Sequence, residues 1–300
     1  MMSVFCGIQQ ISDKKRAKRR APLHAAVLLL GLVLSLGRTV LAEEEASSLF
    51  DQEHLSWSAL LSECVVTMRD GLATAADYQC FDERSEQLQL YLNSLSAVSR
   101  ASFQQFTKAE RLAFLINAYN AWTIELILTE WPKLESIKDL GSLFRSPWKR
   151  EFIPLFGETI SLDDVEHGMI RAKGDYDDPR IHFAVNCASI GCPALLETAY
   201  VGAALEQQLE AQTARFLRDR TRNRLEAGEL ELSPLFKWYR QDFEAGWRGS
   251  SSLGKFLVRY RGALALEDAD VAKLEAGALE IGYLSYDWDL NRPPTSSASR

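Results

Sequence analysis

The chain has 300 residues, of which 47% are hydrophobic, 10% aromatic and 25% charged. This balance is typical of a globular protein and excludes a disordered chain, a collagen-like chain and a disulfide-packed miniprotein. The formal net charge is -7 at pH 7, and the basic residues gathered before residue 42 make the rest of the chain more acidic still. We therefore do not expect a nucleic acid as partner, because proteins that bind the phosphate backbone usually carry a basic surface.

Residues 1–42 have the order of a secretory signal. A basic cluster, Lys14–Arg20, leads into the apolar run Ala25–Leu36, and Val40-Leu41-Ala42 precedes the acidic run Glu43–Glu45. The apolar run is about twelve residues long, whereas a membrane-spanning helix needs roughly 20. We expect cleavage after Ala42 and a periplasmic or secreted protein. The alternative is an uncleaved anchor, which is the one way in which we expect this chain to engage a membrane.

After a flexible lead-in at residues 43–54, the pattern predicts one globular domain over residues 55–290 and a disordered tail at 291–300. Apolar spacing favours helices, and a capping box at Thr107–Glu110 precedes a segment that is apolar on nearly all sides, which indicates a buried helix. The fold class we expect is α+β, with several helices around a small, mainly antiparallel sheet with short hairpins. The predicted helices are 55–68, 83–95, 112–128, 161–171, 201–218, 235–243 and 253–260; the predicted strands are 181–185 and 279–284, with hairpins at 152–160 and 223–232.

Four cysteines remain after signal removal: Cys64, Cys80, Cys187 and Cys192. In an exported protein disulfides persist, and four thiols allow three pairings. A Cys64–Cys80 bridge would join the end of one predicted helix to the start of the next. A Cys187–Cys192 bridge would close the turn between these two residues and leave no free thiol there.

A polar cluster between residues 163 and 193 is the strongest candidate for chemistry. Cys187 lies in a turn where a thiol could be presented as a nucleophile, which needs a base and a group to orient that base. His167 is the better base and Asp163 can orient it, because Asp163, His167 and Arg171 follow each other at i, i+4 and i+8 on one predicted helix. His182 is a poor base for Cys187, since five residues of regular strand separate them. The plainer alternatives are a His167 paired only with its helix neighbours and a His182 bonded to backbone.

Other polar residues predict ligand contacts or scaffolding. Asn117 and Asn120 lie three apart on the apolar helix, where an unpaired amide costs roughly 1–3 kcal/mol, so each needs a loop backbone or a ligand as partner. A zinc site built from His167, His182 and the two nearby cysteines matches no compact spacing, so we expect no metal and no cofactor. The predicted binding residues are Asn117, Asn120, Arg171, Arg180, His182, Asn186, Ser189 and Cys192.

Five stretches of this sequence resemble the family called domain of unknown function 547. They begin with Phe114-Leu-Ile-Asn-Ala-Tyr-Asn-Ala121, Leu162–Arg171 and Asp178–Pro193, and continue with Ser233–Phe243 and Tyr283–Asn291. The resemblance implies a single α+β domain that is often exported in bacteria. In some eukaryotic members the domain is joined to glutaredoxin-type modules, which favours thiol or glutathione chemistry. A similarity to papain-like thiol hydrolases does not extend to chain order, because His167 and His182 both precede Cys187.

Two functions follow from these residues. The first is a thiol-dependent hydrolase or acyl transferase that acts on peptide or glutathione-type amides, with Cys187 as nucleophile, His167 as base and Asp163 as orienting group. The second is a non-catalytic envelope domain that binds a small anionic or peptidic ligand in a cleft made rigid by a Cys187–Cys192 disulfide. Neither the substrate nor the oligomeric state follows from the sequence.

Overall fold

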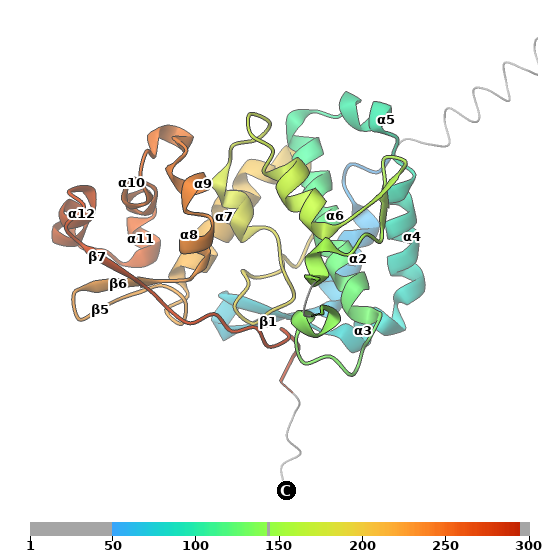
Figure 1. Cartoon of the computed structure of the whole chain (residues 1–300), viewed down its shortest axis with the longest axis horizontal. Helices are drawn as coiled ribbons and strands as arrows, with labels where there is room; N and C mark the ends of the chain where they lie inside the picture. Colours follow the sequence, from blue (N-terminus) through green and yellow to red (C-terminus); the bar gives the residue numbers. More distant parts are fainter. Residues whose placement is uncertain (1–49, 143–144, 295–300) are drawn as a thin grey trace, which may run out of the picture. The chain divides into compact units, whose positions relative to one another are not determined.

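The buried helix α6 (Lys108–Leu128) is the element around which the first half of the chain packs (Figure 1). The computed structural model describes residues 50–142 and 145–294, so the predicted signal at 1–42 lies outside the described residues. The predicted capping box starts α6: Thr107 Oγ1 accepts from the Glu110 N–H at 3.2 Å, and Glu110 Oε2 accepts from the Thr107 N–H at 2.7 Å. Within the described part of the chain, no helix combines the length and apolar character needed to cross a membrane.

The helices α2 (Leu55–Cys64), α3 (Tyr78–Glu83) and α4 (Ser85–Ser96) pack against α6 or against one another, and α5 (Arg100–Gln105) precedes α6. The helix predicted to reach residue 68 ends at Cys64, and the chain continues as the strand β1 (Val65–Met68), paired antiparallel with β2 (Ala73–Ala76). The β-branched residues that open β1 favour a strand over a helix once a partner strand is present. A Cys64–Cys80 disulfide joins α2 to α3, as one of the predicted pairings had it.

The middle of the chain forms short elements. After the 3₁₀ helices η2 (Ile137–Leu140) and η3 (Pro147–Lys149), the predicted hairpin is present as β3 (Ile153–Leu155) and β4 (Glu158–Ile160). The helix predicted after Ser161 is present, and its segment Asp164–Ile170, labelled η4, is a π-helix. The strand predicted at 181–185 is wrong: Pro179–Phe183 form the 3₁₀ helix η5. Proline at its start and the Asp178 cap, which accepts from the Arg180 N–H at 3.0 Å, favour a helical turn there.

The last third of the chain builds a second apolar cluster around Phe183, Phe216, Phe236, Phe243 and Phe256. Its sheet joins β6 to β5 in the predicted antiparallel hairpin and to β7 in a parallel pair. The α+β class is confirmed, with antiparallel pairs prevailing over this one parallel pair. The elements are η6 (Gly202–Ala204), α7 (Leu205–Arg218), β5 (Arg224–Glu226), β6 (Glu229–Leu232), α8 (Leu235–Trp238), α9 (Arg240–Glu244), η7 (Trp247–Gly249), α10 (Leu253–Val258), α11 (Arg261–Leu264), α12 (Asp268–Glu275) and β7 (Glu280–Tyr283).

Both ends of the predicted domain extend further than expected. His54 is buried and Phe50 packs against the first core, so part of the expected flexible lead-in is folded. Beyond β7 the chain returns to the first half of the fold (Figure 1), where Asn291 is buried. Asn291 O accepts from the Ala76 N–H at 2.8 Å, and its Oδ1 accepts from the Tyr78 hydroxyl at 2.6 Å. The domain therefore includes Asn291, which the sequence pattern assigned to the disordered tail.

Candidate functional site

A cavity of about 230 Å³, which we call the aromatic pocket, lies where the π-helix, the Cys187 loop, α8 and the C-terminal segment meet. It brings together all three residues of the predicted catalytic set, Asp163, His167 and Cys187, from two separate segments of the chain. Aromatic side chains make up half of its lining. The lining residues are Tyr119, Ser146, Trp148, Asp163, Glu166, His167, Cys187, Leu235, Trp238, Tyr239, Tyr286 and Trp288.

The π-helix η4 supplies the acidic and basic groups of this pocket. The predicted row on the helix forms: His167 Nε2 lies 3.5 Å from Asp163 Oδ1, and His167 Nδ1 is hydrogen-bonded to the Arg171 guanidinium. His167 thus pairs with its own helix neighbours and also lines the pocket. π-Helical segments are rare and occur frequently at functional sites, which makes η4 a second reason to place the site here.

A carboxylate on α9 organises the wall behind Tyr239. Asp242 Oδ2 accepts from Arg171 Nε at 2.7 Å and from His182 Nε2 at 2.7 Å. Burial raises the pKa of Asp242, but the hydrogen bonds from His182 and Arg171 outweigh it and the net pKa is lowered. Burial lowers the pKa of His182, against the opposing effect of Asp242. His182 is therefore neutral at pH 7, and its ring stacks on Tyr239 at 3.9 Å between centroids. The hydrogen-bond partner of His182 is therefore the side chain of Asp242, and the alternative of a His182 bonded to backbone is wrong.

Glu166 is the buried carboxylate of the pocket, and phenols surround it. Its Oε1 accepts from the Tyr239 hydroxyl at 2.8 Å. Burial, followed by the charge of Glu166, raises the pKa of both Tyr119 and Tyr239, so both phenols stay protonated as donors. The phenols thus hold the carboxylate of Glu166 in place at the wall of the cavity.

The predicted nucleophile is bonded to a second sulfur. Cys187 and Cys192 form a disulfide, which is the pairing that the binding hypothesis expected. Cys187 is partly exposed and lines the pocket, whereas Cys192 is buried. The Tyr286 hydroxyl lies 3.2 Å from Cys187 Sγ and 3.3 Å from Cys192 Sγ. Cys187 is therefore not a free thiol in this structure.

The two helix amides hold loops and do not face the pocket. Asn117 makes two hydrogen bonds to the backbone of Tyr200, at 2.7 and 2.9 Å. Asn120 donates to Ala184 O at 3.0 Å and accepts from the Asn186 N–H at 2.8 Å. Both amides thus have the loop-backbone partners that one of the alternatives expected, and Asn120 anchors the chain just before Cys187.

The remaining predicted binding residues also lie outside the pocket lining. Asn186 donates to Pro193 O at 2.8 Å, which closes the disulfide loop. Ser189 is buried behind the disulfide. The buried Arg180 is paired with Asp178, Glu206 and Glu210 at 2.7, 2.7 and 3.1 Å. These residues build the scaffold around the site.

The sequence patterns did not predict the aromatic lining of the pocket. Trp238 and Tyr239 lie on and just after α8, and Tyr286 and Trp288 lie in the last segment, far from the polar cluster in sequence. All four fall within stretches that carry the family resemblance, which was the available signal. These residues share a pocket only because the C-terminal segment returns to the π-helix, which the sequence does not indicate.

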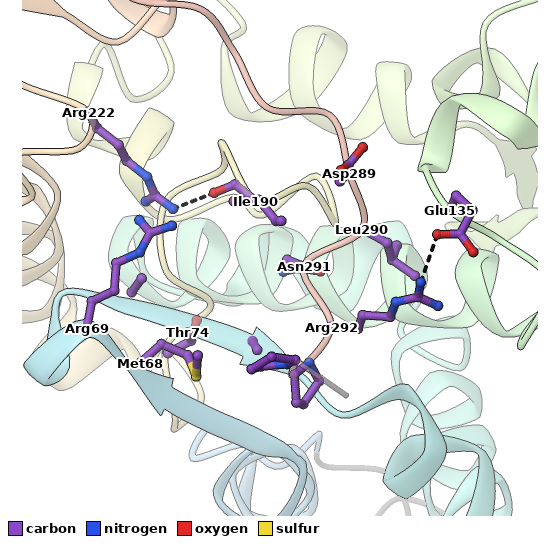
Figure 2. Close-up of a pocket in the computed structure, with 14 residues that line it drawn as sticks. Met68, Arg69, Thr74, Glu135, Ile190, Arg222, Asp289, Leu290, Asn291 and Arg292 are labelled. Atoms are coloured by element: carbon purple, nitrogen blue, oxygen red, sulfur yellow. Dashed lines mark hydrogen bonds and ion pairs between the residues drawn. The ribbon is translucent and has the colours of Figure 1, made fainter. Parts of the chain in front are cut away.

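A larger hollow of about 390 Å³ lies beside β1 and β2 and contains none of the predicted site residues (Figure 2). Its three arginines already have acidic partners. Arg69 lies 2.9 Å and Arg222 3.4 Å from Asp219, and Arg292 lies 2.8 Å from Glu135. Arg69 and Arg222 share the one carboxylate of Asp219. Because the hollow is lined by no cysteine and no histidine and by none of the predicted site residues, we take the aromatic pocket as the candidate site.

No group of three or more His, Cys, Asp and Glu side chains is arranged to hold a metal ion in the part of the chain that the structure describes. No curated protein and no solved structure matches this chain. Residues 103–217 match the family described as "Protein of unknown function, DUF547". This range includes α6, the π-helix and the disulfide loop. The match includes three of the five stretches on which the predicted resemblance rests.

Proposed function

We propose that this protein is an exported binding domain whose aromatic pocket takes a cationic group, either a small organic ammonium or a basic residue of a peptide. The observation that carries the proposal is the composition of the pocket: five tryptophan and tyrosine rings besides Tyr119, with the carboxylates of Asp163 and Glu166 among them. Aromatic faces attract cations through the ring quadrupole, most strongly where the cation is desolvated.

The charges near the pocket favour a cation over the anionic ligand that the sequence suggested. Arg171 is neutralised by Asp242 at 2.7 Å, and Arg180 by three carboxylates. Neither arginine lines the pocket. Burial keeps His182 neutral by lowering its pKa. Glu166 accepts from the Tyr239 hydroxyl and forms no ion pair within the described residues. Arg171, whose charge acts on Glu166, is itself paired with Asp242, so the carboxylate of Glu166 remains able to attract a cation.

Trp238 is the aromatic side chain that an entering ligand would contact first. Its side chain is exposed, at 47% of its full accessible area, although it is a large aromatic group on the rim of a pocket. Its ring is stacked on Trp288, with centroids 5.7 Å apart. Such a platform favours a ligand that presents an apolar face together with its charge.

The test is a titration of the oxidised full chain with candidate ligands, in which intrinsic tryptophan fluorescence reports binding. Tetramethylammonium and a short arginine-containing peptide are compared with a neutral compound of similar shape, neopentyl alcohol, and with acetate. We expect saturable binding of the two cations, and about tenfold weaker binding for the neutral compound and the anion. Equal binding of acetate and tetramethylammonium would contradict the proposal. The two cationic arms distinguish a small ammonium ligand from a peptide.

Two variants test the residues. Glu166→Gln keeps the acceptor for Tyr239 but removes the charge, and Trp238→Ala removes the platform. Each should weaken cation binding by about five- to tenfold. Glu158→Gln is the matched control, because Glu158 is exposed on β4 and does not line the pocket. An unchanged affinity in both pocket variants would place the binding elsewhere.

A thiol-dependent hydrolase or acyl transferase is the second candidate, because Cys187 and the Asp163–His167 pair line the same pocket. This activity requires a reduced protein, since a disulfide sulfur is not a thiolate nucleophile. After mild reduction, iodoacetamide should label Cys187 readily below pH 7, and His167→Ala should abolish this reactivity. A reduced protein whose Cys187 reacts no faster than a simple thiol excludes the hydrolase and leaves the binding proposal untouched.

A further inference from the structure

We propose that Cys187–Cys192 is an exchangeable disulfide, attacked at Cys187 by an external thiol and opened with Cys192 as leaving group. The two sulfurs differ in access. Cys187 is partly exposed and lines the aromatic pocket, whereas Cys192 is 2% exposed and lies behind it. A thiolate that enters the pocket therefore meets the sulfur of Cys187 first.

The two sulfurs also differ in their hydrogen-bond donors. Cys192 Sγ accepts from the backbone N–H of Cys187 at 3.0 Å and of Ser189 at 3.4 Å. The Tyr286 hydroxyl adds a third donor at 3.3 Å. Donors that point at a sulfur stabilise its thiolate, and a thiol with a lower pKa leaves faster in exchange. Within the described residues no backbone N–H donates to Cys187 Sγ, so the loop favours departure of Cys192.

Tyr286 is the positioning residue of this exchange. Its hydroxyl lies within 3.3 Å of both sulfurs. Burial raises the pKa of Tyr286, so the phenol keeps its proton and donates to the sulfur that carries the charge. The close approach of its ring to the loop also requires Gly191, because a Cβ there would lie 2.9 Å from the Tyr286 ring.

The exchange balances with a thiol as co-reactant. The thiolate of a small thiol forms a bond to Cys187 Sγ, the Cys187–Cys192 bond breaks, and Cys192 departs as a thiolate that takes up a proton. A second thiol then attacks the mixed disulfide at the sulfur of the bound thiol, which releases the small-molecule disulfide and leaves Cys187 as a thiolate that is protonated in turn. Two thiols lose two electrons and two protons, and the two cysteines gain them.

Cys64–Cys80 provides an internal control. Cys64 is fully buried, and Cys80, although partly exposed, packs against the first core and does not line the aromatic pocket. The oxidised, folded full chain is incubated with dithiothreitol or glutathione, quenched with iodoacetamide, and mapped by peptide mass. We expect labels at Cys187 and Cys192 to appear at least about tenfold faster than at Cys64 and Cys80. Opening of both disulfides at one rate, or only in denaturant, would overturn the proposal.

The direction of attack has its own test. When reduction of the wild-type protein by glutathione is quenched early with iodoacetamide, the mixed disulfide should carry glutathione on Cys187 and the alkyl label on Cys192. Glutathione on Cys192 with the label on Cys187 would overturn the assignment of the attacked sulfur. The measurement uses the wild-type protein, so it does not depend on the folding of a variant.

The role of the phenol is measured by Tyr286→Phe, which should slow the reduction of Cys187–Cys192 about fivefold. Tyr283→Phe is the matched control, because Tyr283 lies on β7 and the phenol that is hydrogen-bonded to the two sulfurs belongs to Tyr286. An unchanged rate in Tyr286→Phe would overturn the role of the hydroxyl. The proposal does not rest on cation binding, which is measured on the oxidised protein without any thiol.

Discussion

His54 is a buried histidine whose environment opposes its protonation. Its Nδ1 lies 2.7 Å from the Tyr91 hydroxyl, and its Nε2 is buried with no hydrogen-bond partner. Burial lowers the pKa of His54 to about 4, although Asp51 acts in the opposite direction. The sequence placed this residue in a flexible lead-in, because nothing in its neighbours indicates the aromatic cluster that covers it. The same physical effect, burial, lowers the pKa of His182 in the candidate site.

The first prediction is that acid lowers the stability of the protein through His54. Between about pH 6.5 and pH 4 the unfolded chain protonates His54 and the folded chain does not, so the free energy of unfolding should fall with decreasing pH across this window. At pH 4 the loss reaches about 3 kcal/mol for this residue. In His54→Asn, which tolerates the left-handed backbone at this position, this part of the decrease should be absent. Urea unfolding from pH 7 to pH 4.5 measures it, and identical slopes for wild type and variant would contradict it.

At the level of single helices and hairpins, neighbouring residues were enough to predict where several elements begin. The capping box that begins α6 was readable from Thr107 and Glu110, and the hairpins were readable from their turn residues. The π-helix and the 3₁₀ helix η5 were not, because a helical pattern does not reveal its hydrogen-bond spacing and a short buried turn imitates the alternation of a strand.

The cap of α6 gives the second prediction. Thr107→Ala should lower the free energy of unfolding by about 1 kcal/mol, because the Glu110 N–H loses its side-chain acceptor. Thr107→Ser keeps the acceptor and should remain within about 0.5 kcal/mol of wild type. Urea unfolding at pH 7 compares the three proteins, and a loss of equal size in both variants would show that the methyl group, not the cap, matters.

A matched pair of glycines in the short C-terminal helices gives the third prediction. A Cβ at Gly262 in α11 meets nothing within 4 Å, whereas a Cβ at Gly254 in α10 lies 2.8 Å from Leu274 O. Gly262→Ala should raise the free energy of unfolding by about 0.5 to 1 kcal/mol, because it restricts the unfolded chain. Gly254→Ala should lower it by about 1–3 kcal/mol through overpacking. Effects of the same sign in thermal melts of the two variants would contradict this packing of α10 against α12.

At the scale of the whole molecule, two apolar clusters share one chain, and segments far apart in sequence connect them. Phe183 of η5 belongs to the second cluster, while its neighbours Ile181 and Ala184 belong to the first. The C-terminal segment returns to the first half through Asn291, whose amide donates to Asn186 Oδ1 at 3.3 Å. The disulfide loop between these segments is therefore held from both halves of the fold.

The two disulfides should contribute differently to global stability, which is the fourth prediction. Cys64 and Cys80 are 16 residues apart, and Cys187 and Cys192 are five apart. The entropy of loop closure gives about 3 kcal/mol for the longer loop and about 2 kcal/mol for the shorter one. Urea unfolding of the two double-alanine variants measures both losses. A larger loss for the 187/192 pair would mean that the loop carries native contacts beyond the cross-link.

The sequence by itself determined the α+β class, the buried helix α6 and its cap, most hairpins, and the similarity of residues 103–217 to the DUF547 family. These features depend on hydrophobic periodicity, turn chemistry and motifs, which are local. The tertiary structure decided which side chains share the pocket, because Tyr286 and Trp288 reach Cys187 only after the C-terminal segment crosses back over the fold. It also decided that Arg171 and Arg180 are neutralised and that Cys187 is joined to Cys192, since the proximity of charges and sulfurs is a property of three-dimensional packing.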